Sequence, residues 1–147
     1  MVHNFKLFPE LTNNQMQFYY FESPHKQITE DFTAKVVKVT DGDTIRVEVD
    51  FRDFNFPIRL ARIAAPETNE VGGLESQRFL SERILGEEVE VKLTKQRVEK
   101  WGRLLAEIFF MGMNLGQASI DAGYSVMWEA RQKAIPDFNK QMGRIWK

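Results

Sequence analysis

Short stretches in which apolar and polar residues alternate dominate the middle of this 147-residue chain. Ile45, Val47 and Val49 alternate with charged residues, and the same pattern returns from Glu88 to Leu93. A period of two places every second side chain on one face of a strand, so each stretch predicts a half-buried strand. Three more strand-like runs cover residues 34–39, 58–63 and 103–110. The pattern therefore predicts five short strands.

Three helices are predicted around these strands. Residues 74–85 form a helical pattern that ends before Gly86, a good residue just beyond a helix C-terminus. After the fifth strand, residues 115–122 predict a second helix with Asn114 at its N-cap, and Pro136 is suited to open a third. One helix between the third and fourth strands and two C-terminal helices predict a β-barrel with helices, of the α+β class. The expected architecture is a five-stranded OB-fold barrel.

The composition excludes several classes of chemistry. The chain has no cysteine, which removes disulfides, thiolate metal sites and cysteine nucleophiles together. With 43% hydrophobic residues, a chain of this length buries enough apolar surface to fold as one domain without them. The formal net charge is −1, so there is no general positive field for nucleic acid. Any phosphate contact must come from a few well-placed cations.

The N-terminal part differs from the rest of the chain. Residues 18–21 are four consecutive aromatic residues, and Pro24 soon breaks any helix. We interpret residues 1–31 as an aromatic arm and residues 32–147 as the OB-fold domain. The arm is expected to cover the domain or to bind a protein partner or a second copy of the chain; base stacking by its aromatic residues is an alternative.

No segment predicts a membrane or export function. The first residues lack a basic start followed by an apolar run, so no signal peptide is visible. No stretch approaches the ~20 apolar residues that cross a bilayer. The sequence is therefore expected to be soluble, and cytoplasmic if the chain is complete.

Three motifs contain candidate catalytic or metal-binding residues. The sequence D-G-D-T at residues 41–44 is a turn with two carboxylates, the ligands that hard cations prefer. Arg59 alternates with apolar neighbours and so does not need to point into the core, while Glu67 follows a proline that ends the strand. The third motif, K-W-G-R at residues 100–103, turns at its glycine and starts a strand at Arg103.

In this order the three motifs resemble the staphylococcal nuclease family, and the resemblance extends from about Thr33 to Trp146. It implies an enzyme that hydrolyses phosphodiester bonds in DNA or RNA with the help of Ca²⁺. It implies that Asp43 and the backbone carbonyl of Ala65 bind the metal, and that Asp41 orients Asp43 or its water.

The resemblance also implies roles for the remaining motif residues. Glu67 is expected to be the general base that activates water. Arg59 and Arg103 are expected to hold the phosphate and stabilise the transition state, and Lys100 and Trp101 to contact the substrate. These residue types suit the reaction, since phosphodiester hydrolysis needs an oriented water, a base and charge neutralisation on the phosphate oxygens.

One position departs from the family pattern. The family has Ile-Asp-x-Pro-Glu where this chain has Ile-Ala-Ala-Pro-Glu, so Ala64 stands in place of the second metal carboxylate. A methyl group cannot bind a metal, and Ca²⁺ affinity follows the ligand charge, so a weakened site is expected. Three hypotheses follow. The enzyme works at high metal concentration or with another divalent metal; Glu70 or Asp53 supplies the missing acid; or the domain has lost catalysis and binds nucleic acid or a protein partner.

Overall fold

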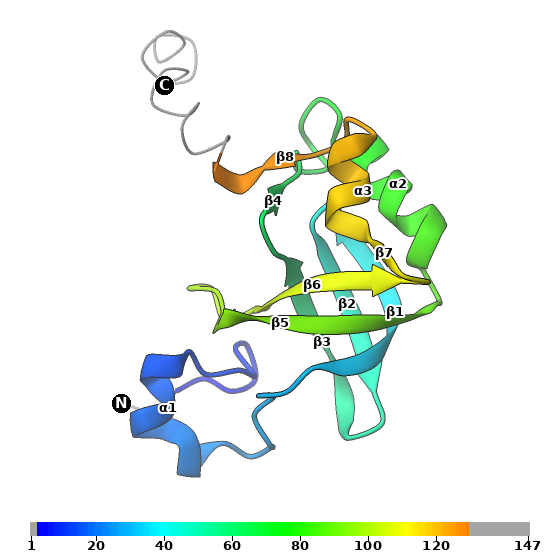
Figure 1. Cartoon of the computed structure of the whole chain (residues 1–147). Coiled ribbons are helices and arrows are strands. Elements are labelled where there is room, and N and C mark those ends of the chain that lie inside the picture. Colours follow the sequence, from blue (N-terminus) through cyan, green and yellow to red (C-terminus); the bar gives the residue numbers. More distant parts are fainter. Residues whose placement is uncertain (1–2, 130–147) are drawn as a thin grey trace, which may run out of the picture.

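The computed structural model describes residues 3–129 and contains a closed five-stranded barrel (Figure 1). Its strands are β1 (Phe32–Asp41), β2 (Thr44–Val49), β3 (Arg52–Leu60), β5 (Glu88–Val98) and β6 (Leu104–Phe110). They follow the order β3-β2-β1-β5-β6, and a parallel pairing between β3 and β6 closes the barrel. The helix α2 (Gly73–Ile84) lies between the third and fourth barrel strands along the chain. The predicted OB-type barrel is thus confirmed.

The smaller elements lie at the two ends of the barrel. At one end, α2 and α3 (Leu115–Asp121) are in contact, and the arm lies at the other end (Figure 1). The arm contains α1 (Asn13–Tyr19) and the 3-10 helix η1 (Tyr20–Glu22). The remaining strands are β4 (Ile63–Ala64), β7 (Met113–Asn114) and β8 (Val126–Met127), with β4 paired to β8. The helix expected from Pro136 onwards lies outside the described residues.

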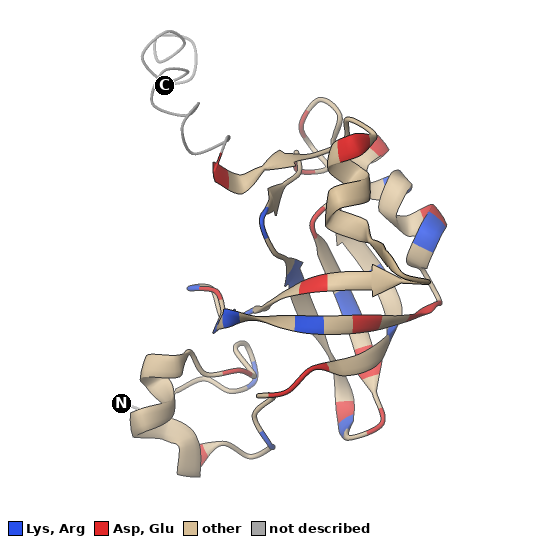
Figure 2. Ribbon diagram, viewed as in Figure 1, with Lys and Arg blue, Asp and Glu red and all other residues tan. Residues whose placement is uncertain are grey.

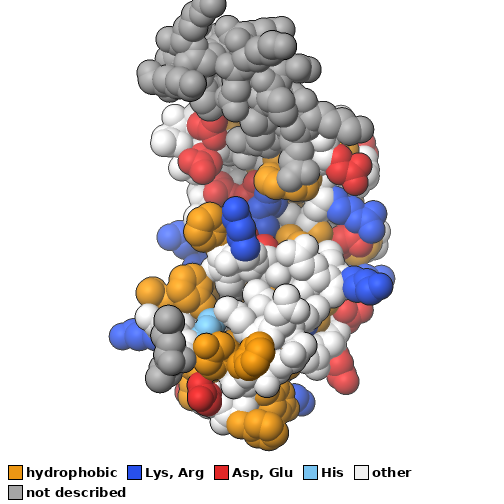
Figure 3. Space-filling view, turned by 90° about the vertical axis from the view of Figure 1, so that its left-hand side faces the viewer, with side chains coloured by type: hydrophobic (Ala, Val, Ile, Leu, Met, Phe, Trp, Pro, Cys, Tyr) orange, Lys and Arg blue, Asp and Glu red, His pale blue; other side chains and the backbone are white. Residues whose placement is uncertain are grey.

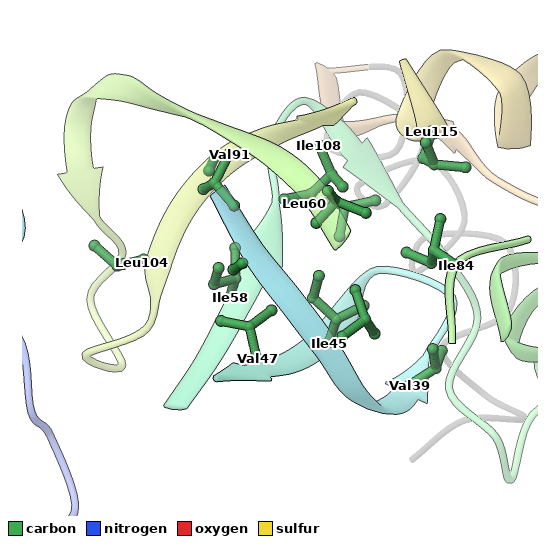
Figure 4. Packing of buried hydrophobic residues seen from close by; sticks show 14 of the residues in the cluster. Val39, Ile45, Val47, Ile58, Leu60, Ile84, Val91, Leu104, Ile108 and Leu115 are labelled. Carbon is green, nitrogen blue, oxygen red and sulfur yellow. The ribbon is translucent and has the colours of Figure 1, made fainter. Parts of the chain in front are cut away.

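The alternating residues of the strands fill the barrel. Figure 4 shows Ile45, Ile58, Leu60 and Ile108 close together inside it, and all four are buried. Ile84 of α2 joins the same cluster and covers one end of the barrel. Removal of this apolar surface from water is the main stabilising contribution to the fold. None of the helices in the described range is long and apolar enough to cross a membrane.

The predicted end of the strand over residues 58–63 is wrong. The strand stops at Leu60, and Arg62 has a φ of 69°, outside the extended region. This left-handed residue breaks the alternation, so the Arg62 side chain is exposed and lies 3.7 Å from Glu107 instead of following its buried neighbours. The chain therefore turns between β3 and β4 and enters the loop that carries Ala65 and Glu67.

The arm is fastened to the barrel through a buried carboxylate. Glu10 is 2% exposed, and its carboxylate oxygens lie 2.5 Å from Arg52 Nη2 and 3.1 Å from Arg97 Nη1. Arg97 also donates to the backbone carbonyls of Leu11 and Ile28, which closes the arm around the end of β5. The arm therefore packs on the barrel, which is the first of the arrangements expected from the sequence.

Candidate active site

The turn between β1 and β2 holds two aspartates at the rim of the barrel. The amide of Asp43 donates to Asp41 Oδ1 over 3.1 Å, which fixes the turn. A Cβ atom on Gly42 would lie 1.8 Å from Ser76 Oγ of α2 and 2.8 Å from the Ala65 Cβ. Only glycine therefore lets this turn approach α2, so the helix positions both carboxylates.

Asp43 is the centre of the hydrogen-bond network. Its side chain accepts from Thr44 Oγ1 over 3.0 Å and from the Ala65 amide over 3.0 Å, and its Oδ2 lies 3.3 Å from Arg59 Nη2. Burial alone would raise the pKa of Asp43. The hydrogen bond with Asp41, the Arg59 charge and the two donors outweigh burial and lower this pKa below its ordinary value. Asp43 is thus a carboxylate at neutral pH.

Asp41 behaves in the opposite way. Burial, with the hydrogen bond and charge of the neighbouring Asp43, raises the pKa of Asp41 to about 6. Two carboxylates this close repel each other when both are ionised. A divalent cation would relieve that repulsion, so the pair fits a hard metal ion.

Arg59 lies at the end of β3 and faces Asp43. It donates to the carbonyls of Leu60 and Ile63 over 2.5 and 2.9 Å, which hold the guanidinium in place. The ring of Trp128 lies 5.8 Å from its Cζ. Burial and the nearby charge of another arginine lower the pKa of Arg59, while Asp43 raises it. An arginine keeps its charge at any working pH despite such shifts.

Arg103 reaches the same network from the start of β6. Its Nη1 donates to Thr44 Oγ1 over 3.1 Å, and Thr44 in turn donates to Asp43. Its Nε and Nη2 donate to the two oxygens of Glu99 over 3.1 and 3.2 Å. Figure 2 shows basic residues both at the end of β3 and at the tip of the β5–β6 hairpin. The structure thus joins Asp41, Asp43, Arg59, Ala65 and Arg103 in one network through Thr44 and Asp43.

Two functional neighbours were missed by the sequence interpretation. Glu99 orients Arg103, and its spacing of four residues before that arginine was a usable signal. Trp128 gave no signal, because its contact with Arg59 depends on the pairing of β8 with β4.

Glu67, Lys100 and Trp101 lie on loops around this network. In the described part of the chain their side chains form no hydrogen bond with it, although the Trp101 amide donates to Glu99 Oε1 over 3.1 Å. Glu67 follows Ala65 by two residues and its side chain is exposed, while its amide donates to Glu70 Oε1 over 2.8 Å. Lys100 and Trp101 occupy the tip of the β5–β6 hairpin, with Lys100 Nζ 5.0 Å from the Trp101 ring. Their roles stay predictions.

Asp53 and Glu70 are the two acids hypothesised to replace the carboxylate that is missing at Ala64. Asp53 lies near the start of β3, six residues from Arg59, or about 20 Å along a strand. The hypothesis that Asp53 replaces the missing carboxylate is therefore wrong. The carboxylate of Glu70 accepts from the Glu67 amide within its own loop, and Ala64 is buried where β4 pairs with β8. The hypothesis that Glu70 replaces the missing carboxylate stays a prediction. Within residues 3–129, no group of three or more acidic, His or Cys side chains is arranged to hold a metal.

The chain resembles several curated nucleases over part of their length. An uncharacterized endonuclease of Escherichia coli is 34% identical over 100 residues, which are 67% of this chain and 63% of the relative. A micrococcal nuclease of Shigella flexneri is 35% identical over 79 residues, covering 54% of this chain and 43% of the relative. A thermonuclease of Staphylococcus hyicus is 30% identical over 95 residues, or 60% and 55% of the two chains.

The chain thus spans between 43% and 63% of the length of the curated relatives it matches. Residues 57–145 match the family described as staphylococcal nuclease homologue. This segment includes Arg59, Glu67 and Arg103, and it begins inside the barrel described above. The chain belongs to the staphylococcal nuclease family.

Proposed function

We propose that the protein hydrolyses phosphodiester bonds in DNA or RNA at this rim, with a divalent metal. The observation that supports the proposal most is the network that brings Arg59 and Arg103 to the two sides of Asp43 and Thr44. Two arginine forks beside a carboxylate suit a phosphodiester, whose charge grows in the transition state. The nuclease names of the relatives agree with this reading.

The arginines keep hydrogen-bond donors available for the phosphate. A guanidinium has five N–H groups. Arg103 uses three of them, toward Glu99 and Thr44, so two remain for phosphate oxygens. The bonds that hold Arg103 also fix its orientation, which lowers the ordering cost when substrate binds.

Glu67 is proposed as the base. Its exposed carboxylate takes a proton from the attacking water, whose oxygen forms the new bond to phosphorus. The bond to the leaving oxygen breaks, and that oxygen takes a proton from solvent. Arg59 and Arg103 stabilise the charge on the remaining phosphate oxygens in the transition state.

A metal would bind at Asp43 and the Ala65 carbonyl, with Asp41 as its support. Ca²⁺ is proposed because all of these donors are oxygens, and the small number of carboxylates predicts weak binding. A bound divalent cation supplies charge neutralisation on the phosphate and acidifies water.

Digestion of single-stranded DNA, RNA and plasmid DNA with Ca²⁺, Mg²⁺, Mn²⁺ or chelator tests this function. We expect metal-dependent cleavage, and a fall of about 10²–10⁴-fold in rate for Glu67→Gln. Glu82→Gln, at an exposed position of α2, is the matched control and should cleave like wild type. If wild type equalled Glu67→Gln in every metal, the hydrolase proposal would be wrong.

A second candidate is a catalytically impaired module that binds nucleic acid or a protein partner, and Ala64 is the residue that favours it. Ala64→Asp should raise Ca²⁺ affinity at least about tenfold and raise the Ca²⁺-dependent rate, because it restores a second carboxylate. The uncharged Ala64→Asn is the control for size and burial. A calorimetric titration without gain would mean that another group already fills this place; a gain in binding without cleavage would favour the second candidate.

A further inference from the structure

We propose that Phe8 of the arm and Trp101 of the β5–β6 hairpin form a stacking platform for unpaired bases of a single-stranded nucleic acid. The proposal rests on the proposed function, since the platform adjoins the arginine that is to hold the phosphate. Phe8 lies outside the segment that matches the family. The arm would therefore add a substrate subsite of this chain's own.

Phe8 lies directly against the hairpin that carries Trp101. Gly102 has a φ of +87°, and a Cβ atom on it would lie 2.6 Å from Phe8 Cδ1. The phenylalanine ring thus occupies the space that any other residue at position 102 would fill. Both aromatic residues therefore adjoin Gly102 at the tip of the hairpin, Phe8 through its ring and Trp101 as the preceding residue.

The position of Phe8 is fixed by its neighbours. The three residues that follow it, Pro9 to Leu11, are buried. Glu10, the middle one, forms the ion pairs with Arg52 and Arg97 that fasten the arm to the barrel. The backbone carbonyl of Phe8 also bonds to His3 Nε2 over 2.8 Å. A ring held this firmly loses little conformational freedom when a ligand binds.

Both rings nevertheless remain accessible to a ligand. Trp101 is 61% exposed and Phe8 37% exposed. The positive charge of Lys100 lies 5.0 Å from the Trp101 ring centre, and Lys6 is exposed on the same arm. Figure 3 shows hydrophobic side chains gathered over this face, with Lys and Arg side chains beside them. Aromatic rings with adjacent cations suit bases joined by phosphates.

The neighbouring arginine favours a nucleic acid over other occupants. Arg103 follows Trp101 by two residues and lies in the network with Thr44 and Asp43. A strand with one phosphate at Arg103 would carry its adjoining base toward Trp101 and Phe8. A duplex keeps its bases stacked on each other, so only an unpaired strand gains from both rings.

Binding in chelator, where no metal-dependent cleavage occurs, tests the platform. Fluorescence anisotropy would compare a labelled single-stranded 12-mer of DNA, the same RNA and the corresponding duplex. We expect Phe8→Leu and Trp101→Leu each to weaken single-strand binding about tenfold, in the range typical of a lost base–aromatic stack. Phe8→Tyr and Trp101→Phe should retain most of the affinity, and duplex binding should change little.

Phe51→Leu is the matched control, since Phe51 is 56% exposed at the β2–β3 turn, at the far end of these strands from Arg59. Leucine keeps an apolar side chain against Gly102, and thermal unfolding verifies each variant. If Phe8→Leu is unstable, Phe8→Met replaces it, because methionine also keeps an apolar contact with Gly102 but has no ring on which a base can stack.

The possible results separate the platform from the function. Unchanged single-strand affinity in both leucine variants, or an equal loss for single strand and duplex, would overturn the platform even if the enzyme cleaves DNA. If single-strand binding depends on the two rings but no metal supports cleavage, the platform proposal holds and the proposed hydrolase function is wrong. A dimer in light scattering that either leucine variant dissociates would instead identify a second copy of the chain as the occupant.

Discussion

Asp41 and Asp43 illustrate how residues of one type acquire different properties within one turn. Asp43 receives a hydroxyl, an amide and a guanidinium, which hold its pKa below the ordinary value. Asp41 lies beside that charge without an arginine in contact, and its pKa rises to about 6. The motif predicted a turn that carries two carboxylates, but only the tertiary contacts of Arg59 and Ala65 decide which one is more readily ionised.

The metal-free protein should therefore gain stability from Asp41→Asn at neutral pH. The folded-state pKa of Asp41 is raised from 3.8 to about 6, so wild-type stability falls as the pH rises from about 4 through 6. A shift of this size corresponds to about 3 kcal/mol, and partial exposure reduces the expected gain to about 1 kcal/mol. Urea unfolding in chelator at pH 3.5 and 7.5 measures it. An advantage that is equal at both pH values would contradict the raised pKa.

Gly42→Ala tests how closely the aspartate turn approaches α2. The new Cβ would lie 1.8 Å from Ser76 Oγ, so we expect a loss of about 2–3 kcal/mol in stability. Gly86→Ala is the control: its Cβ meets nothing within 4 Å, although its φ of +81° costs about 1 kcal/mol. Ser76→Ala should recover part of the Gly42→Ala loss in the double variant. Equal losses of stability in Gly42→Ala and Gly86→Ala would mean that the aspartate turn does not pack tightly against α2.

At the scale of elements, the sequence predicted what depends on local periodicity. The strands and α2 follow from patterns of two and of three to four residues, and Asn114 caps α3 as expected by accepting from the Gln117 amide. The sequence interpretation overlooked α1, although Thr12 and Gln15 form a capping box at its start. The attachment of the arm was not predictable, because Glu10 and Arg97 are far apart in sequence and meet only in the fold.

Glu10→Gln should loosen this attachment. It would leave Arg52 and Arg97 buried without a countercharge, and loss of one partner in such a group costs about 3–5 kcal/mol. Glu22→Gln, at an exposed acid of the same arm, should change stability little. Chemical unfolding gives the free energies, and proteolysis near residues 12–24 reports release of the arm. Equal stability of the two variants would show that the buried ion pairs do not hold the arm.

The whole molecule carries 20 basic and 21 acidic residues, so its affinity for nucleic acid must depend on a few cations at the rim. If Arg59, Lys100 and Arg103 contact three phosphates, the logarithm of the single-strand binding constant should fall with log salt with a slope of about −2. Lys100→Gln should reduce that slope by about 0.7, whereas Lys35→Gln, an exposed residue near the start of β1, should leave it unchanged. Anisotropy titrations in chelator, at salt concentrations from about 50 to about 300 mM, would measure this slope. A slope steeper than about −5 would require a broad basic surface and would contradict a site built from three local cations.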